Sequence, residues 1–289
     1  MKAIILAAGK GSKLNPFSNT RPIPMISVAG KALLDNSLFQ LKKAGINDVY
    51  IIVGHHKEMI QDFVAEKSDS GMNIHCLEQK NNGGIGDAVL TVKEKISPGE
   101  YFLLIYGDTL TDENIYSKTQ QSFHSFKCPV ASICLPPSNE SFGNVFLNAQ
   151  MKINKIVEKP KGNNFGNYVL SGVFVLPESF FGLLEKNKRS MEKALKALVQ
   201  EGELMASMWE NEWLDIVYPC EILDDSHKIG NIRDFDLDFK KLWLSQKAKK
   251  EVNFIRKTKC FCTHECFNSV NILFNPKNYL EIIKKSNLI

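Results

Sequence analysis

The residues that follow the first apolar run, Lys2–Ala7, could bind phosphate, because they read Ala7-Ala8-Gly9-Lys10-Gly11-Ser12-Lys13-Leu14. A short apolar run bounded by glycine predicts a buried strand that ends in a loop. Glycines in such a loop let backbone N–H groups approach phosphate oxygens, and Lys10, Lys13 and Arg21 add positive charge. The spacing fits neither a Walker A loop nor the full dinucleotide fingerprint, so a tight turn with solvated lysines is an equal interpretation.

Two aspartates could hold a metal ion. Asp108 comes just after the apolar run Tyr101–Tyr106, and Asp215 stands in the segment Trp213-Leu214-Asp215-Ile216. Mg²⁺ prefers one or two carboxylates together with phosphate oxygens and water. From the residues alone, Asp108 could equally be a capping or turn aspartate, and Asp215 fits that structural role better than metal binding.

The elements that would position these residues alternate between apolar runs and amphipathic segments. We expect strands at 2–7, 48–53, 73–77 and 101–106, and helices near 33–41, 57–67 and 86–96. This alternation predicts an α/β fold with a mainly parallel sheet flanked by helices on both faces. Past Pro129, short strands at 130–135, 142–147, 152–158 and 168–176 predict a small antiparallel extension; helices at 178–186 and 190–200 and a strand near 204–209 follow.

The composition favours a cytoplasmic globular protein. Of the 289 residues, 44% are hydrophobic and 24% are charged, which suits a large buried core. No apolar run approaches the roughly 18 residues that a membrane span needs. Four of the seven cysteines are scattered singly, unlike a secreted disulfide framework, and the net charge of +4 gives no sign of nucleic-acid binding.

Seven segments, taken in order, resemble the sugar-phosphate nucleotidyltransferase family, also called the nucleotide-sugar pyrophosphorylases. The first is the glycine segment with Arg21-Pro22-Ile23-Pro24-Met25 and Val28-Ala29-Gly30-Lys31. The others are Gln79 with Gly84-Ile85-Gly86-Asp87-Ala88, Tyr106-Gly107-Asp108, Phe142-Gly143, Glu158-Lys159-Pro160, Ser171-Gly172-Val173-Phe174 and Trp213-Leu214-Asp215-Ile216. Together they cover about residues 1–230, and the resemblance implies a Rossmann-like nucleotide-diphospho-sugar transferase fold.

The resemblance also implies the residues of the site. The nucleotide-binding set is Leu6, Ala8, Gly9, Gly11, Ser12, Lys13, Gln79, Gly84 and Asp108, with Gln79 reading a pyrimidine edge. The sugar-binding set is Gly143, Glu158, Lys159 and Gly172. The resemblance assigns catalytic roles to Lys13, Asp108 and Lys159, and it assigns Mg²⁺ binding to Asp108 and Asp215.

The implied reaction transfers a nucleotidyl group from an NTP, UTP or dTTP by precedent, to a glucose-1-phosphate-like acceptor and releases pyrophosphate. A homo-oligomer is a further expectation. Four features depart from the family pattern. Ile23 replaces a lysine that meets phosphate, Lys13 replaces an arginine, Gly84-Ile85-Gly86 replaces a Gly-Thr-Ala segment, and Leu170 replaces an asparagine. A weakened or inactive nucleotide-sugar-binding paralogue and a cytidylyltransferase for a non-sugar phosphoalcohol are therefore alternatives.

A separate C-terminal appendage is expected after the transferase domain, which gives domains at 1–230 and 231–289. Its cluster of Cys260, Cys262, His264 and Cys266 could bind zinc or an iron–sulfur cluster, but the spacing is unusual and reduced cysteines in a packed tail fit better. The basic stretch 240–259 is typical of a solvated helix face, with an acidic partner or a membrane surface as the alternative.

Overall fold

The computed structural model describes residues 1–14, 17–28, 31–80, 83–111, 113–136, 142–160 and 165–216. Almost all of them belong to one compact unit, Met1–Ile26 with Ala32–Pro219. The expected domain boundary at 230, the cysteine cluster and the basic stretch lie outside the described residues.

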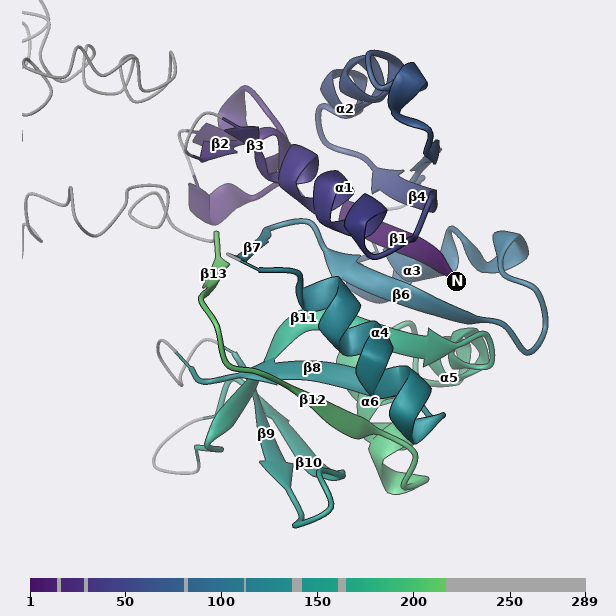
Figure 1. Ribbon diagram of the computed structural model, residues 1–289, viewed down its shortest axis with the longest axis vertical. Helices are drawn as coiled ribbons and strands as arrows, with labels where there is room; N and C mark the ends of the chain where they lie inside the picture. Colours follow the sequence, from purple (N-terminus) through teal and green to yellow (C-terminus); the bar gives the residue numbers. More distant parts are fainter. Residues whose placement is uncertain are drawn as a thin grey trace, which may run out of the picture. The chain divides into compact units, whose positions relative to one another are not determined.

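Helices and strands alternate up to α4, and a run of four strands, β8 to β11, follows it (Figure 1). The strands are β1 (Lys2–Ala7), β2 (Ser27–Val28), β3 (Lys31–Ala32), β4 (Asp48–Val53), β5 (Asn73–Glu78), β6 (Tyr101–Tyr106), β7 (Thr109–Thr111), β8 (Val130–Cys134), β9 (Gly143–Leu147), β10 (Ile153–Glu158), β11 (Tyr168–Pro177), β12 (Met205–Trp209) and β13 (Trp213–Asp215). The α-helices are α1 (Leu33–Lys43), α2 (Lys57–Ala65), α3 (Ile85–Leu90), α4 (Ile115–Phe126), α5 (Phe180–Lys186) and α6 (Met191–Gln200). Short 3₁₀ helices are η1 (Ser12–Leu14), η2 (Phe17–Asn19), η3 (Ile23–Met25), η4 (Ser68–Ser70) and η5 (Lys93–Lys95).

Within the described residues, nine strands form one mixed sheet. Its main path runs β10-β9-β11-β6-β1-β4-β5, with β8 beside β11 and β12 beside β8. The strands β6, β1, β4 and β5 are parallel, whereas β11 pairs antiparallel with β6, β8 and β9, and β10 pairs antiparallel with β9. The last strand, β12, pairs parallel with β8. The predicted mainly parallel sheet with an antiparallel extension is thus confirmed, and the extension continues the same sheet.

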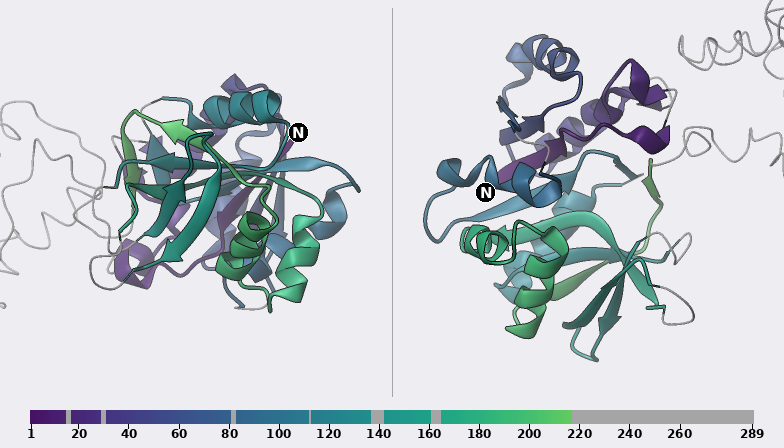
Figure 2. Two further views of the ribbon diagram at one scale, coloured as in Figure 1. Left: turned by 90° about the horizontal axis from the view of Figure 1, so that it is seen from below. Right: turned by 180° about the vertical axis from the view of Figure 1, so that it is seen from behind.

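Helices cover both faces of this sheet, because successive strand residues face opposite sides. On one face, Ile4 and Leu104 pack with apolar residues of α3, α5 and α6. On the other, Ile5 and Leu103 pack with residues of α1, α2 and α4. The two views from opposite sides show α1 and α4 over one face and α5 and α6 over the reverse (Figures 1 and 2).

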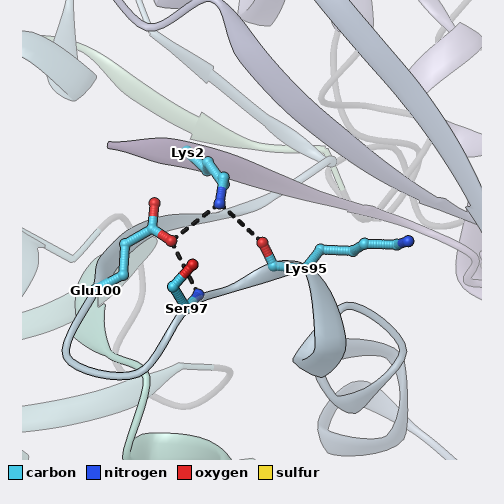
Figure 3. Close-up of polar contacts among 4 residues, drawn as sticks. All are labelled: Lys2, Lys95, Ser97 and Glu100. Carbon is cyan, nitrogen blue, oxygen red and sulfur yellow. Dashed lines mark hydrogen bonds and ion pairs between the residues drawn. The ribbon is translucent and has the colours of Figure 1, made fainter.

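The amino ends of β1 and β6 are held together by a small polar network (Figure 3). The ammonium of Lys2 donates to the Lys95 carbonyl and to the Glu100 carboxylate, both at 2.9 Å. The same carboxylate oxygen accepts the Ser97 N–H at 3.0 Å. Although desolvation opposes it, the hydrogen bonds from Ser97 and Lys2 lower the pKa of Glu100. This network fixes the end of the sheet opposite to the candidate site.

Candidate functional site

The carboxyl end of β1 lies at a topological switch point of the sheet. The chain leaves β1 for β4 and β5 on one side and later returns to β6 on the other side. Ligands of open α/β sheets bind where the strand order reverses in this way. The ends of β1 and β6 lie side by side here, since Gly107 N–H, just after β6, donates to Leu6 O at 3.0 Å. The predicted phosphate loop and Asp108 therefore belong to one edge of the sheet.

Gly11 is the most constrained residue of the loop after β1. Its φ is +60°, and a Cβ at this position would lie 2.7 Å from Ile23 Cδ1 and 3.3 Å from Ser18 Cβ. The Gly11 carbonyl accepts bonds from Leu14 N–H at 2.8 Å and from Ser18 Oγ at 2.7 Å. Only glycine fits this conformation and space. Ile23, which stands where the family resemblance expects lysine, packs directly over Gly11.

The loop after β4 holds the phosphate-loop segment at both of its ends. His55 N–H donates to Ala8 O at 3.3 Å, and its ring nitrogen Nε2 lies 3.0 Å from Ser18 O. His56 Nε2 lies 3.0 Å from Asn19 O, and His56 itself has φ +50°. A hydrogen bond to a carbonyl requires the N–H tautomer at Nε2 in both rings. Neither histidine was identified from the sequence, because their role depends on a contact across 37 residues.

Asp108 combines partial exposure with one enclosed oxygen. Its Oδ1 is shielded from solvent and, among the described residues, has no hydrogen-bond partner. Burial raises the pKa of this carboxyl group to about 6, against a smaller lowering effect of its own backbone N–H. An enclosed carboxylate oxygen without a donor is costly unless a cation completes its environment.

Asp215 lies on the strand that pairs with the segment after Asp108. Strand β13 runs antiparallel to β7, with Asp215 opposite Thr109, and Ile216 N–H donates to Asp108 O at 2.8 Å. Trp213 anchors this strand, since its indole N–H donates to Ser171 O at 3.0 Å and its ring meets Phe142 edge-on. The two predicted metal ligands, 107 positions apart in sequence, are thus neighbours in the fold.

Tyr106 is a central residue that the sequence analysis did not assign to the site. Burial, followed by the charges of Asp108, Glu158 and Asp215, raises the pKa of its hydroxyl well above the usual range. All three carboxylates therefore lie within electrostatic reach of this hydroxyl. Gly172, with φ +83°, leaves room for the ring, because a Cβ there would lie 3.1 Å from Tyr106 Cβ.

The residues predicted to bind the sugar gather where β9, β10 and β11 meet. Glu158 and Gly143 are directly paired across β10 and β9. A Cβ on Gly143 would lie 2.8 Å from Glu158 Oε2 and 3.1 Å from Leu170 Cδ1. Lys159 has φ +45°, is exposed, and donates its backbone N–H to Phe142 O at 3.2 Å. Desolvation raises the pKa of Glu158, and the nearby Lys159 charge partly offsets this.

Gln79 and Gly84 form a separate pair beyond β5, two strands away from β1. Gln79 N–H donates to Val53 O at 2.9 Å, and its side-chain Nε2 donates to Gly84 O at 3.1 Å. Gly84, with φ +87°, begins α3. The strand order places this pair apart from Asp108, which follows β6 on the other side of β1.

Apart from the Gln79–Gly84 pair, the predicted residues fall into three groups. The first holds Leu6, Ala8, Gly9, Gly11, Ser12 and Lys13, of which Gly9, Ser12 and Lys13 are exposed. Asp108 and Asp215 form the second group. Gly143, Glu158, Lys159 and Gly172 form the third, and Tyr106 contacts Gly172 while carboxylate charges of both groups act on its hydroxyl. No group of three or more His, Cys, Asp or Glu side chains suited to a metal occurs in the described part. A cation here would therefore be held by the two aspartates together with phosphate oxygens and water.

Comparison with known proteins gives relatives over most of the chain. A family model described as "Nucleotidyl transferase" matches residues 2–230. The "Bifunctional protein GlmU" of Methanococcus maripaludis is 31% identical over 240 residues, which is 80% of this chain and 55% of that protein. The "Low-salt glycan biosynthesis nucleotidyltransferase Agl11" of Haloferax volcanii is 28% identical over 78% of this chain and 64% of its own length. The chain thus spans little more than half of these relatives.

Solved structures share the fold. A UDP-glucose pyrophosphorylase complexed with UDP-glucose superposes with a TM-score of 0.68 at 20% identity, over 76% of this chain and 95% of that one. At this identity the likeness concerns the fold alone.

Proposed function

Because the chain belongs to the nucleotidyl transferase family, we propose that it transfers a nucleotidyl group from UTP or dTTP to a sugar 1-phosphate and releases pyrophosphate. The main support for this proposal is the pair of aspartates at the switch point. Among the described residues, the enclosed Asp108 Oδ1 has no hydrogen-bond partner. An acceptor phosphate oxygen would attack the α-phosphorus as the bond to pyrophosphate breaks. Both reactants are anionic, so positioning and charge neutralisation supply most of the rate.

The donor set at this edge fits Mg²⁺. Two carboxylates from adjacent strands, with phosphate oxygens and water, satisfy its preference for oxygen ligands. When bound, Mg²⁺ would neutralise charge that develops on the phosphate oxygens. Asp108 and Asp215 would hold it, while Lys13 and Lys159 would bind the phosphates of the two substrates.

The orientation of Gln79 supports a base with an N3–H group. Gly84 O can only accept a hydrogen bond, so the amide nitrogen of Gln79 must face it and the amide oxygen must face away. That oxygen can accept the N3–H of uracil or thymine. Cytosine carries no hydrogen at N3, which makes CTP the poorer substrate.

A binding module with little turnover is the second candidate. Its support is Ile23, whose side chain packs on Gly11 where a lysine would otherwise meet phosphate. Losing one charge-assisted contact costs about 1.5–3 kcal/mol, or roughly one to two orders of magnitude in rate. In the transferase that we propose, Arg21 or Lys10 supplies the positive charge that the missing lysine would have brought to the phosphate.

Pyrophosphate release from a panel of NTPs and sugar 1-phosphates tests the proposal. We expect release with UTP or dTTP and a glucose-1-phosphate-like acceptor, abolished by EDTA and lowered at least about 100-fold by Asp108→Asn. Asp69→Asn on the exposed η4 is the matched control and should behave as the wild type. Nucleotide binding without release for any pair would favour the binding module, and release only with CTP and a phosphoalcohol would favour a cytidylyltransferase.

The setting of this activity follows from the same proposal. We place it in the cytoplasm, where NTPs are available, in a transferase domain of residues 1–230. No helix in the described part is long and apolar enough to cross a membrane.

A further inference from the structure

Leu170 places an apolar side chain beside the carboxylate of the sugar-binding group. A Cβ built on Gly143 would meet Glu158 Oε2 at 2.8 Å on one side and Leu170 Cδ1 and Cγ at 3.1 and 3.7 Å on the other. The carboxylate and the leucine methyl therefore flank the same point over the Gly143 backbone. Leu170 is only partly buried, so this apolar surface is available to a ligand.

The strand pattern explains why Leu170 faces this side. Its neighbours Val169 and Ser171 are buried on the other side of β11: Val169 packs with the α1 and α4 layer, and Ser171 Oγ donates to Ser132 O at 3.1 Å. Because side chains alternate along a strand, Leu170 shares its face with Gly172. Gly172 in turn lies against the Tyr106 ring. One carboxylate thus stands next to an apolar flank made by Leu170 and Tyr106.

We propose that this subsite selects an acceptor that presents an apolar carbon, a deoxy position or a methyl group, next to the hydroxyl that Glu158 binds. The inference rests on the proposed transferase function and narrows its acceptor class. A hydroxyl pressed against Leu170 loses its hydrogen bonds to water and gains no partner, which is unfavourable. A methylene or methyl group at the same place buries apolar surface instead.

The size of the effect follows from this chemistry. A hydrophobic surface rejects an added hydroxyl only moderately, by about 10- to 100-fold in kcat/KM. A deoxy acceptor should therefore be preferred by about tenfold over its parent, without excluding the parent.

The test compares glucose 1-phosphate with its monodeoxy analogues, using UTP, in the full-length wild type and three variants. In the wild type we expect at least one deoxy analogue to exceed the parent about tenfold in kcat/KM. Leu170→Asn should abolish or reverse this ratio, because its amide can bond the hydroxyl, while Leu170→Val should retain it. Phe39→Asn, on the exposed face of α1, is the control and should leave the ratio unchanged. A purely structural defect would lower kcat/KM equally for both substrates and would not change their ratio.

Calorimetric binding of UDP-glucose and its monodeoxy analogues separates this inference from the proposed function. If no acceptor turns over but the deoxy UDP-sugars bind more tightly in a Leu170-dependent way, the transferase proposal fails and the inference stands. If turnover occurs with a deoxy-to-parent ratio within about twofold in wild type and Leu170→Asn alike, the inference is overturned and the transferase stands. Absence of both turnover and binding overturns both.

Discussion

At the scale of single residues, the Asp108 carboxylate lowers the stability of the metal-free protein but supplies the negative charge that a cation needs. Its enclosed Oδ1 raises the carboxyl pKa to about 6, so the folded metal-free protein binds a proton more tightly than the unfolded chain does. A raised carboxyl pKa means that stability falls as the pH rises from about 4 through 6. The charge that a cation needs is thus kept at a cost to the metal-free fold.

Asp108→Asn should therefore stabilise the metal-free protein while it removes transfer. Urea denaturation in EDTA at pH 8 should give the variant a free energy of unfolding on the order of 1–2 kcal/mol above the wild type, and this difference should fall below pH 6 and approach zero only below about pH 4. Asp69→Asn serves again as the control, since Asp69 is exposed. A variant less stable than the wild type at pH 8 would show that Asp108 is a structural residue.

The residues of the site differ in how far the sequence could identify them. Asp108 comes just after the apolar run Tyr101–Tyr106. Its position at the end of a strand could therefore be predicted without knowing which residues it contacts. Asp215 needed the resemblance, because its place depends on β13 pairing with β7 far away in the chain. Tyr106 stood in a segment that carries the resemblance but was given no role, and His55 and His56 carried no signal. The contacts of all three come from segments that only the folded sheet brings together.

At the scale of elements, buried strands were predictable and polar or very short elements were not. The bounds of β1, β4 and β6 were predicted as observed, since each is a continuous apolar run. Helix α4 was missed because it is mostly polar, with only Ile115, Tyr116 and Thr119 buried. The expected helix over 86–96 was wrong in extent, as α3 ends at Leu90 and η5 follows. Strands β7 and β13 have three residues each, too few for a periodic pattern.

The contact between α3 and the α5–α6 loop sets how closely these elements pack. A Cβ on Gly86 would lie 2.0 Å from the Arg189 carbonyl oxygen, which is main chain and cannot rotate away. The Arg189 side chain also pairs with the buried Asp87 at 2.5 Å. The start of α3, which follows Gln79 and Gly84, is therefore tied to the loop between two other helices.

Gly86→Ala should separate these elements and lower the free energy of unfolding by about 2 kcal/mol or more, as overpacking of a core does. Gly182→Ala, inside α5 with nothing within 4 Å of its Cβ, is the matched control. It should raise stability by about 0.5–1 kcal/mol, because alanine is the better helix former. Urea titration of both variants measures the contrast. Equal effects of the two substitutions would contradict the close packing at Gly86.

At the scale of the described unit, stability and chemistry occupy opposite ends of the parallel strands. The carboxyl end of β6 carries Tyr106 and, just after it, Asp108 with its enclosed oxygen. The charges of Glu158 on β10 and Asp215 on β13 also act on the Tyr106 hydroxyl. The amino ends carry the satisfied network of Lys2, Lys95, Ser97 and Glu100 (Figure 3). A substitution in this network should therefore change stability without changing turnover.

Glu100→Gln tests this separation through its pH dependence. The lowered pKa of Glu100 means that its contribution to stability is fully present above the unfolded value near 4.5 and is lost as the pH falls through the folded value. The variant should lose about 0.5–1 kcal/mol at pH 7, a modest amount because the pair is partly solvated, and its deficit should shrink as the pH falls below 4.5. Glu94→Gln on η5 is the control for removing a charge nearby. Denaturation from pH 3.5 to 7, with parallel pyrophosphate-release assays, measures both properties. A loss of unfolding free energy that does not depend on pH, or a loss of kcat/KM with UTP, would show that the two ends of the sheet are not independent.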